Sequence, residues 1–485
     1  MIRRVFRKWI FISMLAAPAA HADDLRVMTF NIEYGGHHVS WDNVKQAIRD
    51  AKADIVGIQE AEGNLAQLAD ELGWHYDRRN YVISRFPVIE PPGADGKYVW
   101  VETEPGNGVA MANVHLPSDP YGPYQVRDGV GLEDVITMER ATRLPMIGVY
   151  ARALLPLIQS DVPLFLTGDF NAPSHRDWTP ETVGKRPFLK YPVPWPVSRA
   201  MERLGFKDSF RAVHPDPVKD PGLTWWSGRP PLDFYAPGEN DPQDRIDFVW
   251  FAGPAKALSS EVVGEKGGPG VSIGLSPWPS DHRAVVSLFR VEPVALPDLV
   301  TTARRVYRVG QDVIVRYHLG KDEQRKLSLW RAGFGQPITS IEVNGDGNQT
   351  FETTELGPGH YRATLEAAGA VAPMNREFWV QALDAVPALE VQAEHFKADQ
   401  PIPLQWSNAP GNRNDYIGIY PENVEPGYES AVAWAYVDAL PDGSLTLDKT
   451  TSSGVWPLAP GRYVARLIED DGAATLAKSK AFVVE

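Results

Sequence analysis

Residues 163–171 read PLFLTGDFN, a short apolar run that ends in an aspartate and an asparagine. An apolar run of this length between turn-forming residues is typical of a buried β-strand. Three further runs end in polar residues, at 25–31 in Asn31, at 54–60 in Glu60 and at 108–115 in His115. Loops at strand ends are where a rigid sheet presents functional groups. The pattern therefore predicts a sheet with polar side chains gathered along one edge.

Helical patterns alternate with these strands. Apolar residues recur at i, i+3, i+4 and i+7 in two places, at Val44, Ala47, Ile48 and Ala51 and again at Leu65, Leu68, Ala69 and Leu72. This spacing predicts two amphipathic helices, the first with Ser40 as its N-cap. Asp281 and His282 lie at the start of the strand 282–289 instead of at its end. If they join the other polar residues, that strand runs opposite to the first ones, which predicts a mixed sheet.

The composition limits the possible functions. A chain of 485 residues is long enough for roughly two to four domains, and its 42 prolines and 41 glycines favour strands and turns over a helical bundle. The chain has no cysteine, which excludes disulfides, thiolate zinc sites and thiol catalysis. The formal net charge of −14 counts against tight binding of a polyanion.

The N-terminus has the form of a targeting signal. Basic residues precede an apolar run over residues 9–20, and Ala20-His21-Ala22 is a small-x-small cleavage site. We therefore expect residues 1–22 to be a signal peptide and the mature protein to be periplasmic or secreted. Arg3-Arg4 leaves the twin-arginine route open beside general secretion. No stretch is long and apolar enough for a transmembrane segment.

The pattern changes near residues 294–297. Beyond them, short alternating runs are separated by glycine, proline and aspartate turns, which predicts β-sandwich structure. Residues 308–317 match 397–406, and residues 356–363 match 458–465. The matched segments begin 89 and 102 residues apart, and a repeat of that length predicts two tandem domains. The expected division is a catalytic domain over 23–292, a first β-sandwich over 298–383 and a second over 387–485.

Four motifs occur in a fixed order within residues 24–290: Gln59-Glu60, Gly168-Asp169-Phe170-Asn171, Arg245-Ile246-Asp247 and Ser280-Asp281-His282. In order and local context they resemble the endonuclease/exonuclease/phosphatase family, which includes deoxyribonuclease I, sphingomyelinases and inositol phosphatases. The resemblance implies an α/β fold, a four-layer α/β-sandwich with mixed sheets like that of deoxyribonuclease I, followed here by two all-β sandwich domains. It also implies a metal-dependent hydrolase acting on phosphoric ester bonds.

The residue types fit a hard divalent cation. Glu60, Asp281 and the amide oxygen of Asn31 are oxygen donors, which suit Mg²⁺, or alternatively Mn²⁺ or Ca²⁺, better than zinc. A cation at this position neutralises phosphate charge and stabilises the leaving oxygen. We therefore expect these three residues to be the metal ligands.

The resemblance also implies catalytic roles. Asp169 and Asn171 would hold or activate the attacking water, and His282 would contact the phosphate or act as the base. Asp247 would orient His282 by accepting its other ring proton. His115 matches the histidine that serves as general acid in the deoxyribonuclease branch. The identity of the general base stays open at this point.

Two residues are weaker candidates for substrate contacts. Arg140 lies on a helical stretch, where a solvated arginine is an equal alternative. Trp225 lies before the Asp247 strand, where family members place a substrate-facing loop, but core packing is a serious alternative. The expected function is in-line hydrolysis of a phosphodiester by an exported nuclease or other phosphodiesterase. The alternatives are a phosphomonoesterase on small or lipid phosphates and, less favoured, a non-catalytic binding protein.

The expected partner is a phosphoester substrate: a nucleic acid, a lipid head group or a small molecule. The C-terminal pair carries no catalytic set of its own. Residues 415–420 and 460–463 look like the immunoglobulin-like module found beside some secreted phosphatases. We expect these domains to act as a spacer or to bind a cell surface or polymer, and a contribution to the substrate cleft is the less favoured alternative.

Overall fold

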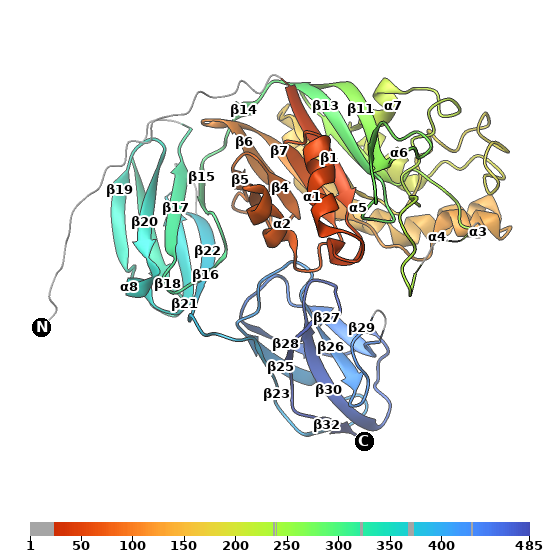
Figure 1. The fold of residues 1–485 in the computed structure, drawn as a ribbon. Helices are drawn as coiled ribbons and strands as arrows, with labels where there is room; N and C mark the ends of the chain where they lie inside the picture. Colours follow the sequence, from red (N-terminus) through yellow and green to blue (C-terminus); the bar gives the residue numbers. More distant parts are fainter. Residues whose placement is uncertain (1–23, 236–237, 239, 321–323, 367–372, 428–429) are drawn as a thin grey trace, which may run out of the picture.

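The computed structural model describes residues 24–235, 238, 240–320, 324–366, 373–427 and 430–485. The expected signal peptide, residues 1–22, lies outside these ranges. Within them, no helix is long and apolar enough to cross a membrane. Figure 1 shows the α/β domain (red to green) beside the first β-sandwich (cyan) and above the second (blue).

The α/β domain contains two mixed sheets. The first has the strand order β12 (Ile273–Leu275), β11 (Ala255–Glu265), β13 (Ala284–Val291), β1 (Asp24–Asn31), β2 (Ile55–Gln59), β4 (Val82–Ser84), β3 (His75–Asp77). The second has the order β5 (Val88–Ile89), β6 (Val99–Glu104), β7 (Asn107–His115), β8 (Leu164–Asp169), β10 (Asp247–Ala252), β9 (Lys207–Asp208), and β14 (Val294–Ala295) pairs with β7. Strand β1 is parallel to β2 and antiparallel to β13, so the predicted mixed sheet is confirmed.

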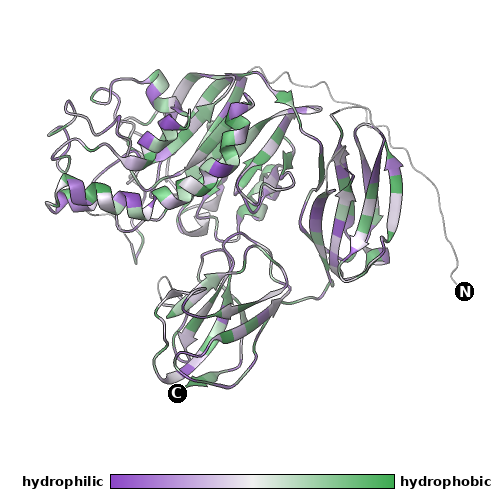
Figure 2. Ribbon diagram, turned by 180° about the vertical axis from the view of Figure 1, so that it is seen from behind, coloured by the Kyte–Doolittle hydropathy of each residue, from purple (hydrophilic) through white to green (hydrophobic). Residues whose placement is uncertain are grey.

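The two sheets pack face to face through apolar side chains. Leu25 and Ile55 of the first sheet and Val109 and Phe165 of the second belong to one buried cluster. Helices cover the outer faces: α1 (Trp41–Asp50) and α2 (Leu65–Leu72) lie on the first sheet, and α5 (Leu144–Gln159) and α6 (Pro196–Arg203) lie on the second. These layers confirm the four-layer α/β-sandwich. Figure 2 shows hydrophobic residues concentrated on its central strands.

The predicted helices form for the expected local reasons. Ser40 caps α1 by accepting a hydrogen bond from the backbone N–H of Asn43. Helix α2 ends at Gly73, whose φ of 73° suits the left-handed C-cap conformation. The remaining helical segments are the 3₁₀ turn η1 (Tyr34–Gly36), α3 (Gly122–Arg127), α4 (Leu132–Thr142), α7 (Ser209–Val213) and α8 (Thr353–Leu356).

The C-terminal region forms two sandwiches of similar topology. The first pairs the sheet β15 (Leu299–Thr302), β17 (Asp312–His318), β20 (Gly347–Glu352) with the sheet β16 (Val306–Arg308), β22 (Met374–Gln381), β21 (Gly359–Leu365), β18 (Arg325–Arg331), β19 (Thr339–Val343). The second pairs β23 (Ala388–Val391), β25 (Ile402–Ser407), β28 (Gly443–Leu447) with β24 (His395–Phe396), β32 (Phe482–Val484), β30 (Gly461–Ile468), β26 (Tyr416–Pro421), β27 (Ala433–Tyr436), β29 (Ser453–Gly454), and β31 (Thr475–Lys478) pairs with β30. Each pair of sheets encloses its own apolar core.

The segment 291–297, which joins the expected catalytic domain to the first sandwich, packs against the α/β domain. Strand β14 pairs with β7, and Leu296 and Leu299 belong to the apolar core under the second sheet. The first sandwich is also tied to the α/β domain by an ion pair of 2.7 Å between Arg376 and Glu90. The chain therefore passes directly from one packed unit into the next.

Candidate active site

Strand pairing brings the predicted polar residues to one edge of the α/β domain. Asn31 of β1 is paired with Gln59 of β2, which immediately precedes Glu60. Asp169 of β8 is paired with His115 of β7 on one side and with Asp247 of β10 on the other. Because β10 and β13 run antiparallel to their neighbours, Asp247 and His282 join this edge from the beginnings of their strands.

A compact group of ligating atoms lies at the centre of the edge. One atom each of Glu60, Asp169 and His282 lies within 4.8 Å of the others. Asn31 lies between the two acids, with its Nδ2 2.8 Å from Glu60 Oε1 and 3.2 Å from Asp169 Oδ2. His115 Nε2 is 3.5 Å from Asp169 Oδ2. The structure thus brings together residues of three of the four motifs with Asn31 and His115.

His282 and Asp247 form a buried pair. The Nδ1 atom of His282 is 3.0 Å from Asp247 Oδ2, and its Nε2 is 3.5 Å from Asp169 Oδ2. Burial opposes a charge on the imidazole, but the carboxylates of Asp247, Asp169 and Asp281 outweigh it and raise the pKa of His282 well above its usual value. Asp247 therefore fixes the ring and favours its protonated form, which fits the orienting role predicted for it.

His115 lies at the mouth of the site, where its side chain is 39 % exposed. Its surroundings oppose the charge through burial, but the hydrogen bond and charge of Asp169, together with Glu60, raise the pKa of His115 to about 9. Burial alone would raise the pKa of Asp169, but the positive charges of His282 and His115 lower it. The arrangement supports an ionised Asp169 beside two protonated imidazoles.

Asn171 holds Asp169 in place. Its backbone N–H donates to Asp169 Oδ1 at 2.9 Å, and its Nδ2 donates to the Leu116 carbonyl at 3.0 Å. Asn171 has φ of +47°, a left-handed conformation that asparagine tolerates better than most residues. Asn171 therefore helps to fix the position of the Asp169 carboxylate.

The donor set fits a divalent cation. Asp281 Oδ1 is buried and has no hydrogen-bond partner among the described residues, so its lone pairs are available to a ligand. In the orientation shown, Asn31 Oδ1 accepts from the Glu33 N–H at 3.0 Å and its Nδ2 faces the acids. A half-turn of this amide would present the oxygen beside Glu60 instead. Glu60, Asp281 and a rotated Asn31 would then supply the oxygen ligands that Mg²⁺ prefers.

The two weaker candidates differ in outcome. Trp225 is 8 % exposed, lines the cavity at the site, and donates from Nε1 to Asp281 Oδ2 at 3.2 Å. Trp225 therefore packs at the site and also positions the carboxylate of Asp281. Arg140 is exposed on α4 and does not belong to the described cavity lining, because the helix turns that side chain to solvent. The prediction of Arg140 as a substrate contact is not supported.

Sequence reasoning missed a buried ion pair behind the site. Glu33 Oε1 lies 2.6 Å from Arg229 Nη2, and Glu33 Oε2 accepts from the backbone N–H of Asp281 at 2.9 Å. Burial and the Asp281 charge raise the pKa of Glu33 to about 7, against the lowering effect of Arg229. Glu33 follows Asn31 by two residues, and that proximity was the only sequence signal for it.

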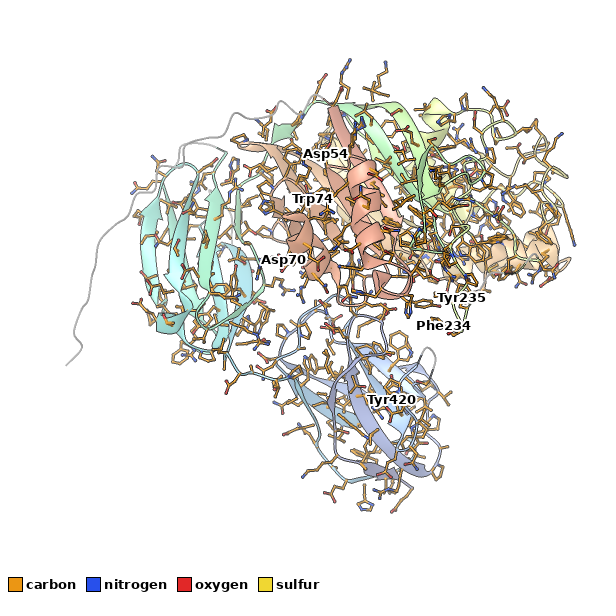
Figure 3. All side chains as sticks on the ribbon, viewed as in Figure 1. Asp54, Asp70, Trp74, Phe234, Tyr235 and Tyr420 are labelled. Atoms are coloured by element: carbon orange, nitrogen blue, oxygen red, sulfur yellow. The ribbon has the colours of Figure 1, made fainter. Side chains whose placement is uncertain are left out.

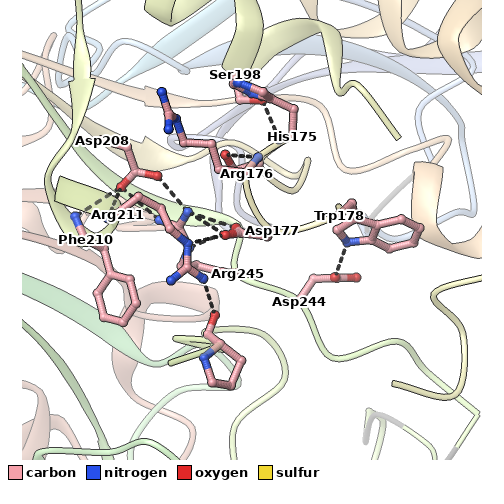
Figure 4. Close-up of polar contacts among 12 residues, drawn as sticks. His175, Arg176, Asp177, Trp178, Ser198, Asp208, Phe210, Arg211, Asp244 and Arg245 are labelled. Atoms are coloured by element: carbon pink, nitrogen blue, oxygen red, sulfur yellow. Dashed lines mark hydrogen bonds and ion pairs between the residues drawn. The ribbon is translucent and has the colours of Figure 1, made fainter. Parts of the chain in front are cut away.

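Arg245 anchors the start of β10. Its guanidinium is buried between the carboxylates of Asp177 and Asp208, with Nη2 2.6 Å from Asp208 Oδ2 and Nε 3.0 Å from Asp177 Oδ2 (Figure 4). Asp177 also pairs with Arg211. Because Asp247 follows Arg245 by two residues, this network fixes the backbone that carries the partner of His282. Its role is structural support of the site.

The site opens into a cavity of about 1160 Å³ that two domains share. The α/β domain contributes, among others, Tyr34, Glu60, His115, Asp169, Trp225 and His282. The second β-sandwich contributes, among others, Arg413, Tyr416, Trp434, Tyr436, Asp438 and Asp471. This finding departs from the expectation of a mere spacer, because loops of the second sandwich form a wall of the site.

Fold and site together match a family whose members are typically phosphoester hydrolases. Residues 28–282 match the Endonuclease/Exonuclease/phosphatase family. An uncharacterized protein of Caenorhabditis elegans is 32% identical over 260 residues, which cover 48% of this chain and 80% of that protein. The chain belongs to the Endonuclease/Exonuclease/phosphatase family.

Solved structures with a similar fold share little sequence. D. rerio TDP2, complexed with a single-strand DNA product, is 12% identical to this chain. The match covers 55% of this chain and 98% of the TDP2 chain, with a TM-score of 0.34. The mannosyl-6-phosphatase Bt3783 of Bacteroides thetaiotaomicron is 15% identical and covers 56% and 99%, with a TM-score of 0.31. These similarities leave the substrate of this chain open.

Proposed function

We propose that this chain is an exported, metal-dependent phosphoesterase that hydrolyses a phosphodiester by in-line attack of an activated water. The observation that carries the proposal is the grouping of Glu60, Asp169 and His282, with ligating atoms within 4.8 Å of one another, above the His282–Asp247 pair. A binding protein would not need this combination of acids and charged imidazoles at one point.

A divalent cation of the Mg²⁺ type, held by Glu60, Asp281 and Asn31, would supply charge neutralisation at the phosphate and at the leaving oxygen. The residues of the chain do the rest. Asp169, which its neighbours keep ionised, orients the water and accepts its proton as the new P–O bond forms. The Nε2–H of His282 faces the same point and can donate to a phosphate oxygen.

His115 completes the cycle as general acid. Its raised pKa keeps the imidazole protonated at neutral pH, so it can give a proton to the alkoxide as the scissile P–O bond breaks. One proton therefore moves from water to Asp169 and one from His115 to the leaving group. Deprotonation of Asp169 and reprotonation of His115 by solvent restore the starting state.

A panel of substrates tests the proposal. The full mature chain is assayed on bis(p-nitrophenyl) phosphate, p-nitrophenyl phosphate, sphingomyelin and DNA with Mg²⁺, Mn²⁺ or Ca²⁺, and after treatment with a chelator. We expect hydrolysis of a diester that is lost with the chelator and restored by the cation. Turnover that persists without any divalent cation would contradict the metal assignment, and inactivity on the whole panel would contradict the function.

A phosphomonoesterase is the second candidate, and the wall that the second sandwich adds to the cavity favours it. Because loops of the second sandwich stand opposite the site, a substrate with one small group on phosphorus fits more readily than a long strand. The ratio of activity on bis(p-nitrophenyl) phosphate to that on p-nitrophenyl phosphate separates the two candidates.

Export is part of the proposal and rests on residues 1–22. Expression of the full chain in a Gram-negative host, followed by fractionation and N-terminal sequencing of the product, tests it. Mature protein that begins at Asp23 in the periplasm or medium is the expected result. Uncleaved protein in the cytoplasm would contradict it.

A further inference from the structure

The second β-sandwich is fastened to the loops that carry the active site. Asp470 accepts hydrogen bonds from the Tyr81 hydroxyl and from the Gly63 N–H, the latter at 2.7 Å. Arg78 Nη1 donates to Asn412 Oδ1 at 2.9 Å. In Figure 1 the loops of this sandwich reach the edge of the α/β domain below β1 and α2. The second sandwich therefore contacts the α/β domain beside the active site.

Three side chains of this sandwich face the cavity with polar groups. Arg413 lines the cavity, and its Nη1 donates to the Tyr150 hydroxyl at 2.6 Å. The Tyr436 hydroxyl donates to Asp471 Oδ2 at 3.2 Å, and the Tyr436 side chain is 41% exposed. Asp471 is exposed to the water of the cavity while protein surrounds it.

Asp471 and His115 line the same cavity from its two domains, and the hydrogen bond from the Tyr436 hydroxyl holds the Asp471 carboxyl group there. A general acid at His115 must be next to the leaving oxygen. The leaving group therefore extends between His115 and the wall formed by Asp471, Tyr436 and Arg413.

The chemistry of this wall limits what it can bind. Asp438, Asp470 and Asp471 line this wall together with Arg413, and Arg79 and Lys97 of the α/β domain line the same cavity, in which acidic side chains outnumber basic ones. Such a surface repels a further phosphate of a nucleic acid strand. Carboxylate acceptors, a guanidinium donor and the rings of Tyr416, Trp434 and Tyr436 suit hydroxyl groups on a small apolar frame.

We propose that the second β-sandwich forms the leaving-group subsite of the enzyme, and that this subsite selects a small, uncharged alcohol that carries several hydroxyl groups, with Arg413 and Asp471 as specificity-determining residues. The inference rests on the proposed function, because it needs His115 to protonate the leaving group. Figure 3 shows Phe234 and Tyr235 on the edge of the α/β domain that faces this sandwich, where they extend the rim.

Matched alcohols test the subsite. The full mature chain is assayed with glyceryl methyl phosphate and propyl methyl phosphate, which differ in two hydroxyl groups, and the released alcohol is measured. If the first panel identifies a monoesterase, glycerol phosphate and propyl phosphate replace them. We expect kcat/KM to favour the glyceryl ester by about 10- to 100-fold, since a site built for hydroxyl groups rejects a substrate that lacks them. Duplex DNA should be a poor substrate.

Variants test whether residues of the second sandwich cause the preference for the glyceryl ester. Arg413→Met and Asp471→Ala should each lower the glyceryl preference about tenfold, chiefly through KM. Arg413→Lys should restore part of it. Arg462→Met is the matched control, because Arg462 is an exposed arginine of the same sandwich whose ion pair with Glu422 lies outside the cavity. If Arg413→Met does not fold, as judged by thermal melting, Asp471→Ala decides the question.

The outcomes distinguish a failure of the proposed subsite from a failure of the proposed function. An active wild type with no glyceryl preference, a preference that survives both variants, or fast hydrolysis of duplex DNA would overturn the subsite and leave the phosphoesterase standing. A wild type inactive on every phosphoester with every cation would overturn the proposed function, and the subsite with it.

Discussion

Asp470 connects the second sandwich to the loop behind Glu60, so its substitution should damage catalysis from outside the catalytic domain. Its carboxylate is buried, 3% exposed, and accepts from the Gly63 N–H and the Tyr81 hydroxyl. Hydrogen bonds to a charged acceptor contribute about 1.5–3 kcal/mol each. Loss of both in Asp470→Ala therefore weakens the contact by roughly 3–6 kcal/mol before the relief of a buried charge is counted.

The expected consequence is a misplaced Glu60. Glu60 and Glu62 both have positive φ, 56° and 44°, so this loop needs outside support to keep its conformation. We expect kcat on bis(p-nitrophenyl) phosphate to fall about 10- to 100-fold and the Mg²⁺ concentration for half-maximal activity to rise. Asp442→Ala is the control, since Asp442 is an exposed aspartate whose bond to the Asn408 N–H lies within the same sandwich.

Steady-state kinetics with a Mg²⁺ titration and a thermal melt of each variant provide the assay. Asp470 lies in the turn between β30 and β31, outside the strands of the second sandwich, so the variant should stay folded. If Asp470→Ala is folded and shows the kcat and Mg²⁺ dependence of the wild type, the sandwich does not hold the Glu60 loop and the reasoning is wrong.

Three further predictions concern single groups. Glu60→Gln should lower activity by orders of magnitude with partial rescue at high Mg²⁺, because it removes a charge from the cation site; unchanged activity in chelator-treated buffer would rule the ligand out. Asp169→Asn and His282→Ala should each remove most turnover, and the double variant should be little worse than either, because the groups act on one water and one phosphate; losses that multiply would contradict this. Burial raises the pKa of Asp415 to about 7, so its contribution to stability is present below the usual aspartate pKa and is lost as pH rises through 7; Asp415→Asn should melt with a weaker dependence on pH between 5 and 8, and an identical dependence would count against the shift.

The sequence was sufficient to predict the α/β domain because its local patterns and its packing agree. The apolar residues of α1 repeat with the helical period behind a capping serine, and those same residues form the core against the first sheet. The polar ends of β1, β2, β7 and β8 likewise predicted one active edge. Strand order and the face-to-face packing of two sheets came from the resemblance, since periodicity alone does not define long-range pairing.

What the sequence could not predict are contacts between residues far apart in the chain. Asp470 and Gly63 are separated by 407 positions, and no local pattern marks either as a partner of the other. For Arg140, helical spacing did not reveal that the residue lies on the solvent-exposed face of α4. Asn31 was correctly placed, but its orientation depends on the Glu33 N–H that holds its oxygen.

The shared cavity would have two regions, one for the cation and the phosphate and one for the leaving group. Near Glu60 and Asp281, negative charge would attract a divalent cation, and that cation would in turn favour the binding of a phosphate. Acidic side chains outnumber basic ones in the lining of the shared cavity, so the proposed leaving-group subsite would disfavour a substrate with further phosphates beyond the first one. The −14 charge of the chain therefore does not oppose phosphoester binding as such. We expect it to restrict binding to substrates whose only strong negative charge is the phosphate at the proposed metal site.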